Sequence, residues 1–264
     1  MLSEVLTFIF FILIGLEIRE GLNKPKDVIL PALAALGGMI VPALIFIAMI
    51  PGSDAWAVSM PTDVALAIGA LSILGKRVNP AVRLFLLTLA VADDFFSLVV
   101  IGIFFRQDLH LASAIYTLGA ATIGFLLPFR HRLIAILSPI ATFAIIPIYI
   151  FINLLTKLDF SLSTESIVVA VVVARVIGKV LGITLFTYLA TRFTSLKLPL
   201  ALDLKEIVGV GFLAGMGLTV SIVIAEITLQ TESELAQVRM GLFFAAILSG
   251  LLGVLWLKRF PASL

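Results

Sequence analysis

The stretch "TLAVADDFFSLVV", Thr88 to Val100, places two adjacent carboxylates in the middle of an apolar run. A charge at the centre of a bilayer costs roughly 2.5–3.5 kcal/mol on insertion scales, so such a pair has to be compensated or used. Neighbouring residues on a helix project about 100° apart, so Asp93 and Asp94 face different surroundings, one a cavity and the other an adjacent helix. Two carboxylates this close titrate as a coupled pair, which lets protons and a small hard cation displace one another.

The composition of the whole chain is that of a membrane protein with several spans. Of 264 residues, 61% are hydrophobic and 13% are charged, and the mean hydropathy is +1.22; soluble domains carry roughly 25% charged residues. The net charge of +2 does not indicate a nucleic-acid partner, and the absence of cysteine excludes disulfides and thiol chemistry. The N-terminal segment lacks a basic start and a small-residue cleavage site, so we expect it to be a first span.

Hydropathy predicts an all-α polytopic membrane protein, a single transmembrane domain over residues 1–264. A span needs roughly 20 apolar residues. The sequence accommodates about nine such helices, at about 3–17, 28–50, 55–75, 82–105, 110–128, 132–156, 164–190, 206–228 and 238–257.

The basic residues between these segments predict the orientation. Cytoplasmic loops of membrane proteins are enriched in lysine and arginine. With the N-terminus outside, the outer loops contain only Arg106, Lys157 and Arg239. The inner loops then contain thirteen basic residues: Arg19, Lys24, Lys26, Lys76, Arg77, Arg83, Arg130, Arg132, Arg192, Lys197, Lys205, Lys258 and Arg259. The C-terminus is therefore expected in the cytoplasm.

Two of the predicted spans are interrupted. The third contains Pro-Thr-Asp, and proline removes a backbone donor and disrupts the preceding turn; the eighth has Gly215, Gly217 and Thr219 at its centre. These spans are the middle members of two three-helix units, about 28–105 and 164–257, which enter the membrane from opposite sides. The units are candidates for an inverted repeat, and paired broken helices are the best pointer in a sequence to a transporter site.

Further polar residues lie in or beside these spans. Asp63 precedes the half-helix 64–74, where a carboxylate neutralises the positive helix end, and Thr62 is a candidate cap. Lys179 either faces half-helix carbonyls or pairs with Asp93. Arg175, one turn from Lys179, is interpreted as snorkelling or lining a funnel. Glu226, near the outer interface, is interpreted as solvated.

Taken together, these residues resemble the NhaA-type sodium/proton antiporter family. The resemblance rests on "PTDVALAIGALSILGKRVNPAVRLFLLTLAVADDFFSL", and is extended by "GLEIREGL", "GGMIVPALIFI", "VIGKVLGITLF" and "GMGLTVSIVIAE" in the family's order. It implies that Asp94 is the principal cation carboxylate and Asp93 the neighbour that pairs with a lysine, Lys179. It also implies that Asp63 and Thr62 form the broken-helix pair. Asp94, Asp63 and Thr62 are then the candidate ligands of the transported metal ion.

The resemblance also implies an activity. The family exchanges one Na⁺ or Li⁺ for more than one proton, without a resident cofactor, across the bacterial inner membrane, and contributes to pH homeostasis. Its fold crosses two discontinuous helices near the membrane midplane. Members have about twelve spans, so nine spans here imply loss of the first and of two middle ones. The oligomeric state stays open, a homodimer included.

At the inner mouth, the resemblance implies pH sensing by Glu17 and Arg19. The sequence departs from the family there, at Glu20 and Gly21, and a solvated helix end is the alternative interpretation.

Three other functions stay open at this point. The shortened chain is compatible with a transport-inactive or regulatory remnant of the family. An intramembrane aspartyl protease using Asp63 with Asp93 or Asp94 fits less well, because "AVADDFF" lacks a glycine-flanked aspartate and Lys179 would have no role. A symporter of organic solutes is disfavoured because the acid pair suits small cations, which prefer several oxygen ligands.

Overall fold

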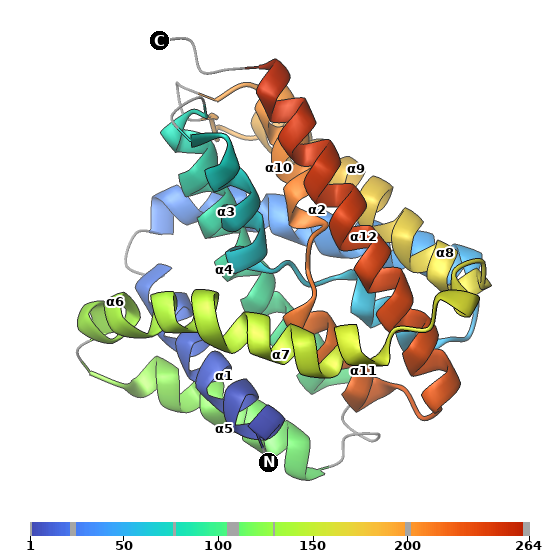
Figure 1. Cartoon of the computed structure of the whole chain (residues 1–264). Coiled ribbons are helices and arrows are strands. Elements are labelled where there is room, and N and C mark those ends of the chain that lie inside the picture. Colours follow the sequence, from blue (N-terminus) through green and yellow to red (C-terminus); the bar gives the residue numbers. More distant parts are fainter. Residues whose placement is uncertain are drawn as a thin grey trace.

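The computed structural model describes residues 2–21, 25–75, 78–104, 111–128, 130–198 and 202–260, and within these ranges it contains helices and no strand (Figure 1). In chain order the helices are α1 (Leu2–Gly21), α2 (Pro25–Met49), the 3₁₀-helical η1 (Asp54–Ser59), α3 (Val64–Ile73), α4 (Pro80–Phe104), α5 (Leu111–Leu126), α6 (Arg130–Ile140), the π-helical η3 (Ala141–Ile145), α7 (Ile146–Asn153), the 3₁₀ turns η4 (Leu155–Lys157) and η5 (Phe160–Leu162), α8 (Ser166–Val173), the π-helical η6 (Ala174–Gly178), α9 (Lys179–Phe193), α10 (Leu204–Ala214), α11 (Thr219–Thr228) and α12 (Glu232–Arg259).

Several of these helices are long and apolar enough to cross a membrane. By length and composition, four stretches of the described residues qualify: 28–49, 54–73, 166–193 and 232–259. A fifth is obtained if α10 and α11, which are bent by 51°, count as one span. The all-helical class and the transmembrane helices predicted from the sequence are therefore confirmed, whereas the count of nine spans stays a prediction.

The distribution of side chains differs from that of a soluble protein on the surface and at the buried charges. Large apolar side chains are exposed on the outside, among them Ile73 at 77%, Leu84 at 64% and Leu255 at 62%. Six charged side chains are nearly inaccessible inside the molecule: Asp63, Asp93, Asp94, Arg175, Lys179 and, on α12, Arg239. This arrangement is expected where the surrounding solvent is lipid, because charges there face the protein interior.

The interruptions predicted in two helices are both present. Residues 60–63 separate η1 from α3, and residues 215–218 separate α10 from α11. Asp63 has an extended backbone and caps the start of α3, while α10 ends at Gly215. Pro61, which has no backbone donor, accounts for the first interruption, and Gly215 and Gly217, which are poor helix formers, favour the second.

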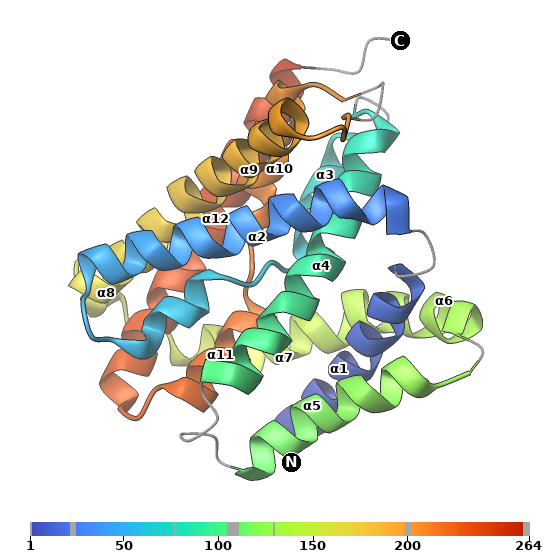
Figure 2. The ribbon, with the colours of Figure 1, turned by 180° about the vertical axis from the view of Figure 1, so that it is seen from behind.

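Close contact between α2 and α9 positions the second half of the chain against the first (Figure 2). Gly37 and Gly182 face one another at this contact, and a Cβ atom on either glycine would overlap the backbone oxygen of the other. Small residues allow helix backbones to approach in this way. Lys179 lies one turn before Gly182, so this contact also holds Lys179 beside α2.

Two apolar cores occupy opposite parts of the molecule. The first core includes η1, through Ala55 and Val58, and α11, through Ile222. The second core includes α3, through Leu71, and α10, through Leu213. Each interrupted helix therefore passes from one core to the other at its interruption, and the two helices make this passage in opposite directions.

Uninterrupted stretches also change core, and two of them carry buried charges where they do so. On α4, Ala92 belongs to the second core and Leu98 to the first, with Asp93 and Asp94 between them. On the α8–η6–α9 stretch, Ala174 belongs to the first core and Ile183 to the second, with Arg175 and Lys179 between them. The buried charges Asp63, Asp93, Asp94, Arg175 and Lys179 thus form a polar layer between two apolar cores.

Candidate functional site

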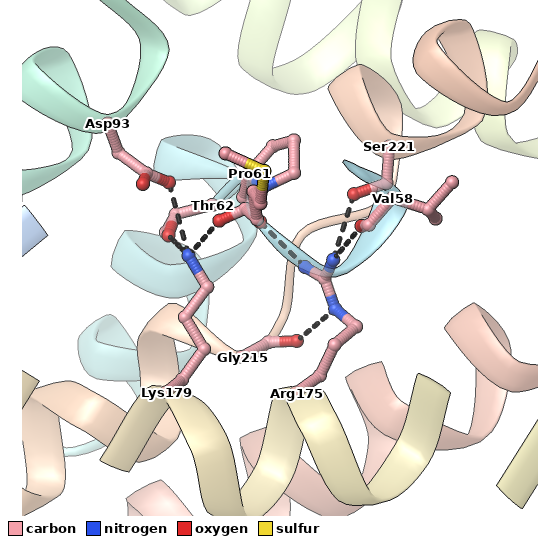
Figure 3. Close-up of polar contacts among 9 residues, drawn as sticks. Val58, Pro61, Thr62, Asp93, Arg175, Lys179, Gly215 and Ser221 are labelled. Carbon is pink, nitrogen blue, oxygen red and sulfur yellow. Dashed lines mark hydrogen bonds and ion pairs between the residues drawn. The ribbon is translucent and has the colours of Figure 1, made fainter. Parts of the chain in front are cut away.

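The centre of the polar layer is the side chain of Lys179 (Figure 3). Its Nζ atom lies 3.2 Å from Asp93 Oδ2, in an ion pair whose two side chains are fully buried. The same ammonium group donates to Thr62 Oγ1 at 2.9 Å and to the carbonyl oxygen of Met60. Of the two roles that the sequence left open for Lys179, the structure contains both, a half-helix carbonyl and Asp93.

Asp93 and Asp94 are presented by consecutive positions of α4 and point in different directions, as helical geometry requires. Asp93 faces Lys179 on α9, whereas Asp94 is buried to 3% exposure and acts on Lys179 through its charge. Asp93 Oδ1 makes no hydrogen bond to any residue that the structure describes. One turn further on α4, the buried Ser97 Oγ likewise has no partner within the described ranges.

Asp63 joins the N-terminal ends of two half-helices. Its Oδ1 accepts a hydrogen bond from the Leu66 amide of α3 at 3.5 Å. Its Oδ2 accepts bonds from both the amide, at 3.3 Å, and the hydroxyl of Thr219, the first residue of α11. The partial positive charges of the two helix N-termini therefore converge on one carboxylate. Thr219 was noted in the sequence only as part of the interruption, so its contact with Asp63 was missed.

Arg175 is the main residue that the sequence interpretation got wrong. A snorkelling or funnel-lining arginine would be partly exposed, but Arg175 is fully buried. Its Nη1 donates to the Val58 carbonyl at 2.6 Å and to Ser221 Oγ at 2.9 Å. Its Nη2 donates to the Pro61 carbonyl at 2.7 Å, and its Nε to the Gly215 carbonyl at 3.1 Å (Figure 3).

The prediction failed because hydropathy does not tell which face of a helix meets protein. The only sequence signal was an arginine one turn from Lys179 in an otherwise apolar span.

The polar layer contains more acidic than basic side chains. Three carboxylates, Asp63, Asp93 and Asp94, lie with two cations, Arg175 and Lys179. With all five ionised, the formal charge is −1, which one monovalent cation or one proton would neutralise. Among the described residues, no cluster of three or more histidine, cysteine, aspartate or glutamate side chains is suited to hold a resident metal ion.

Arg19 and Glu226, two of the residues predicted near the mouths, have their partners outside this centre. Arg19 Nη1 donates to the carbonyl oxygens of Phe125 at 2.8 Å and Leu127 at 3.3 Å, and so fastens the end of α1 to the end of α5. The side chain of Glu17 lies outside the part of the chain that the structure describes. Glu226 is 35% exposed and pairs with Arg239 at 3.6 Å, so it is only partly solvated.

Comparison with known proteins identifies the family. The family model described as Na⁺/H⁺ antiporter 1 matches residues 1–131 and 128–257 of the chain. The Na⁺/H⁺ antiporter NhaA 2 of Aliarcobacter butzleri (strain RM4018) is 30% identical over 318 aligned positions, which cover 96% of this chain and 80% of that protein.

Two further relatives give the same result. The Na⁺/H⁺ antiporter NhaA of Actinobacillus pleuropneumoniae serotype 7 (strain AP76) is 31% identical, covering 95% of this chain and 80% of its own length. That of Salmonella paratyphi B (strain ATCC BAA-1250 / SPB7) is 30% identical, covering 97% and 82%. The names of these relatives are those of transporters, not of catalytic enzymes. The chain therefore belongs to the NhaA-type Na⁺/H⁺ antiporter family, as its paired aspartates and interrupted helices predicted.

Proposed function

We propose that this protein is a secondary antiporter that exchanges Na⁺ or Li⁺ for protons at the polar layer between its two cores. The observation that carries the proposal is the buried Asp93–Asp94 pair on α4, opposite Lys179 and beside both helix interruptions. A pair of carboxylates held in an apolar interior binds either a cation or protons, because it must be neutralised.

The proposed cation ligands are oxygens of the polar layer. Asp94 is the principal carboxylate, and Thr62 Oγ1 and Asp63 are the ligands contributed by the broken helix. Two further candidate ligands are Asp93 Oδ1 and Ser97 Oγ, which have no hydrogen-bond partner among the described residues. Hard monovalent and divalent cations prefer several oxygen ligands. The cation and the protons are cargo, and the proposal includes no resident cofactor.

We propose that transport occurs by alternating access. Na⁺ from the cytoplasm binds deprotonated Asp94 and displaces protons, and the site then opens to the outside. After Na⁺ leaves, outside protons load Asp94 and either Asp93 or Lys179, and the site returns inward. Lys179, whose Nζ donates to Asp93, Thr62 and Met60, is the alternative carrier of the second proton.

The proposed membrane arrangement has nine spans in the inner membrane, with the N-terminus outside and the C-terminus in the cytoplasm. The start of α1 and the end of α12 lie at opposite ends of the molecule in both views, which is compatible with an odd number of spans (Figures 1 and 2). The opposite directions in which the two interrupted helices cross between the cores support an inverted repeat. The polar layer then lies near the membrane midplane.

The test is ion exchange by the purified protein in proteoliposomes that contain a pH-sensitive dye. Addition of Na⁺ or Li⁺ should dequench the dye with the wild type, and K⁺ should have a much smaller effect. Asp94→Asn should abolish the response because it removes the exchangeable charge. Asp159→Asn is the matched control, since Asp159 is an exposed loop carboxylate.

Two results would count against the proposal. Full exchange by Asp94→Asn would exclude the acid pair as the exchange site. Absence of exchange in the correctly inserted wild type, together with failure to rescue sodium-sensitive cells that lack their own antiporters, would favour the transport-inactive remnant.

A further inference from the structure

Arg175 binds the carboxyl-terminal ends of both interrupted helices. Its guanidinium group donates hydrogen bonds to the carbonyl oxygens of Val58 and Pro61 at the first interruption, and to the carbonyl oxygen of Gly215 at the second. Its fourth acceptor, Ser221 Oγ, lies beyond the second interruption, on α11. One guanidinium group therefore spans two interruptions that are more than one hundred residues apart in the sequence (Figure 3).

The charges at the helix ends explain why an arginine suits this place. Carbonyl groups at a helix C-terminus carry partial negative charge, and those of η1 and α10 end near one another in an apolar interior. Asp63 has the mirror-image role, because it accepts bonds from the N-terminal ends of α3 and α11. Arg175 is also in favourable electrostatic interaction with Asp63 and Asp93. Asp63 is thus the counter-charge of the N-terminal helix ends and Arg175 that of the C-terminal ends, where Lys179 adds one contact, to the Met60 carbonyl.

The space around the guanidinium group is fitted to it. A Cβ atom on Gly217 would overlap both Arg175 Nη2 and the Pro61 oxygen. A Cβ atom on Gly215 would approach the backbone oxygen of Arg175 to 3.0 Å. Arg175 itself lies in the π-helical turn η6, directly before Lys179. π-Helical turns are rare in proteins, and those that occur often lie at functional sites.

We propose that Arg175 is a positioning residue for ion exchange, which fixes the two interruptions relative to one another and thereby sets the affinity of the site for its cation. Arg175 does not touch the cation. It holds the segment 58–61 and so keeps Thr62 and Asp63 opposite α4. This inference deepens the proposed function and rests on it.

The experiment measures the half-saturating Na⁺ concentration and the maximal rate of exchange in proteoliposomes. Arg175→Gln and Arg175→Lys should both raise the half-saturating concentration, by about tenfold to a hundredfold, because displacement of ligands by about 1 Å has effects of this size. Lysine should not rescue, although it keeps the charge, because its single nitrogen cannot reproduce the planar fork of the guanidinium group. Arg192→Gln and Arg192→Lys are the matched controls, since Arg192 is exposed near the end of α9.

A milder variant keeps the test decisive if the Arg175 variants do not fold. Ser221→Ala removes one of the four acceptors and should raise the half-saturating Na⁺ concentration by about threefold to tenfold. A purely structural role would lower the amount of folded protein and the maximal rate while leaving the half-saturating concentration unchanged.

The outcomes separate this inference from the proposed function. The positioning role would be overturned if folded Arg175→Gln or Arg175→Lys kept the wild-type half-saturating Na⁺ concentration while the wild type exchanges ions. If neither variant folds, the same result with Ser221→Ala would overturn it. Absence of exchange in the wild type would overturn the proposed function, and this inference with it.

Discussion

Replacing Lys179 with methionine tests the energetic balance of the polar layer most directly. Lys179 and Asp93 are both fully buried, with 3.2 Å between Nζ and Oδ2. Removing one partner of a buried ion pair costs about 3–5 kcal/mol, because the remaining charge is left without compensation. Lys179→Met also deprives the Met60 carbonyl of its donor. For a chain of this size, about 2–4 °C is lost per kcal/mol, so the melting temperature should fall by about 6–20 °C.

The double variant Lys179→Met/Asp93→Asn separates the lost charge from lost packing. It removes both charges and leaves only neutral groups with incomplete hydrogen bonding, at a cost of about 1–3 kcal/mol. The double variant should therefore be about 2 kcal/mol more stable than Lys179→Met alone. Lowering the pH should also stabilise Lys179→Met relative to the wild type, because protonation of Asp93 removes the uncompensated charge.

The assay is thermal unfolding of the detergent-solubilised protein, followed by fluorescence-detected size exclusion. The matched control is Lys258→Met, an exposed lysine at the end of α12, which should change stability by no more than about 0.5 kcal/mol. The reasoning would be refuted if Lys179→Met were as stable as Lys258→Met. It would also be refuted if the double variant were no more stable than the single one.

Two other substitutions have expected effects on stability in the same unfolding assay. Gly217→Ala places a methyl group against Arg175 and should cost about 1–3 kcal/mol by overpacking. Its control is Gly69→Ala, in open space on α3, which should be neutral or stabilising by up to about 1 kcal/mol. Equal changes in stability for the two variants would contradict the contact between Gly217 and Arg175. Glu226→Gln removes the nearest counter-ion of the buried Arg239 and should cost about 1 kcal/mol, the upper value for a partly exposed pair. Glu232→Gln, at a side chain 90% exposed and 3.8 Å from the same arginine, should cost nothing measurable, so a larger effect there would refute the assignment.

Several features of this protein could be predicted from the sequence because their causes are local. The interruption at residues 60–63 follows from a proline that cannot donate a backbone hydrogen bond, and the one at 215–218 from closely spaced glycines. The divergence of Asp93 and Asp94 follows from the helical repeat alone. The lipid-facing surface follows from a composition that no soluble fold could bury.

The partners of the buried groups could not be predicted in the same way. Arg175 was expected at a lipid or water interface, because an apolar span does not indicate which of its faces meets protein. The joint capping of α3 and α11 by Asp63 could not be predicted either, because the sequence places Thr219 at an interruption without indicating its partner.

The sequence by itself determined the solvent of this protein, the positions of its helices and their interruptions, and the presence of an acid pair that has to be neutralised. Each of these depends on residues within one or two helical turns. Only the tertiary structure decided which charges neutralise which helix ends, because those contacts join residues far apart in the chain. Arg175 reaches Gly215 across 40 residues, and Thr219 reaches Asp63 across 156. In an interior without water, such groups must find partners in the protein, and packing of the helices selects them.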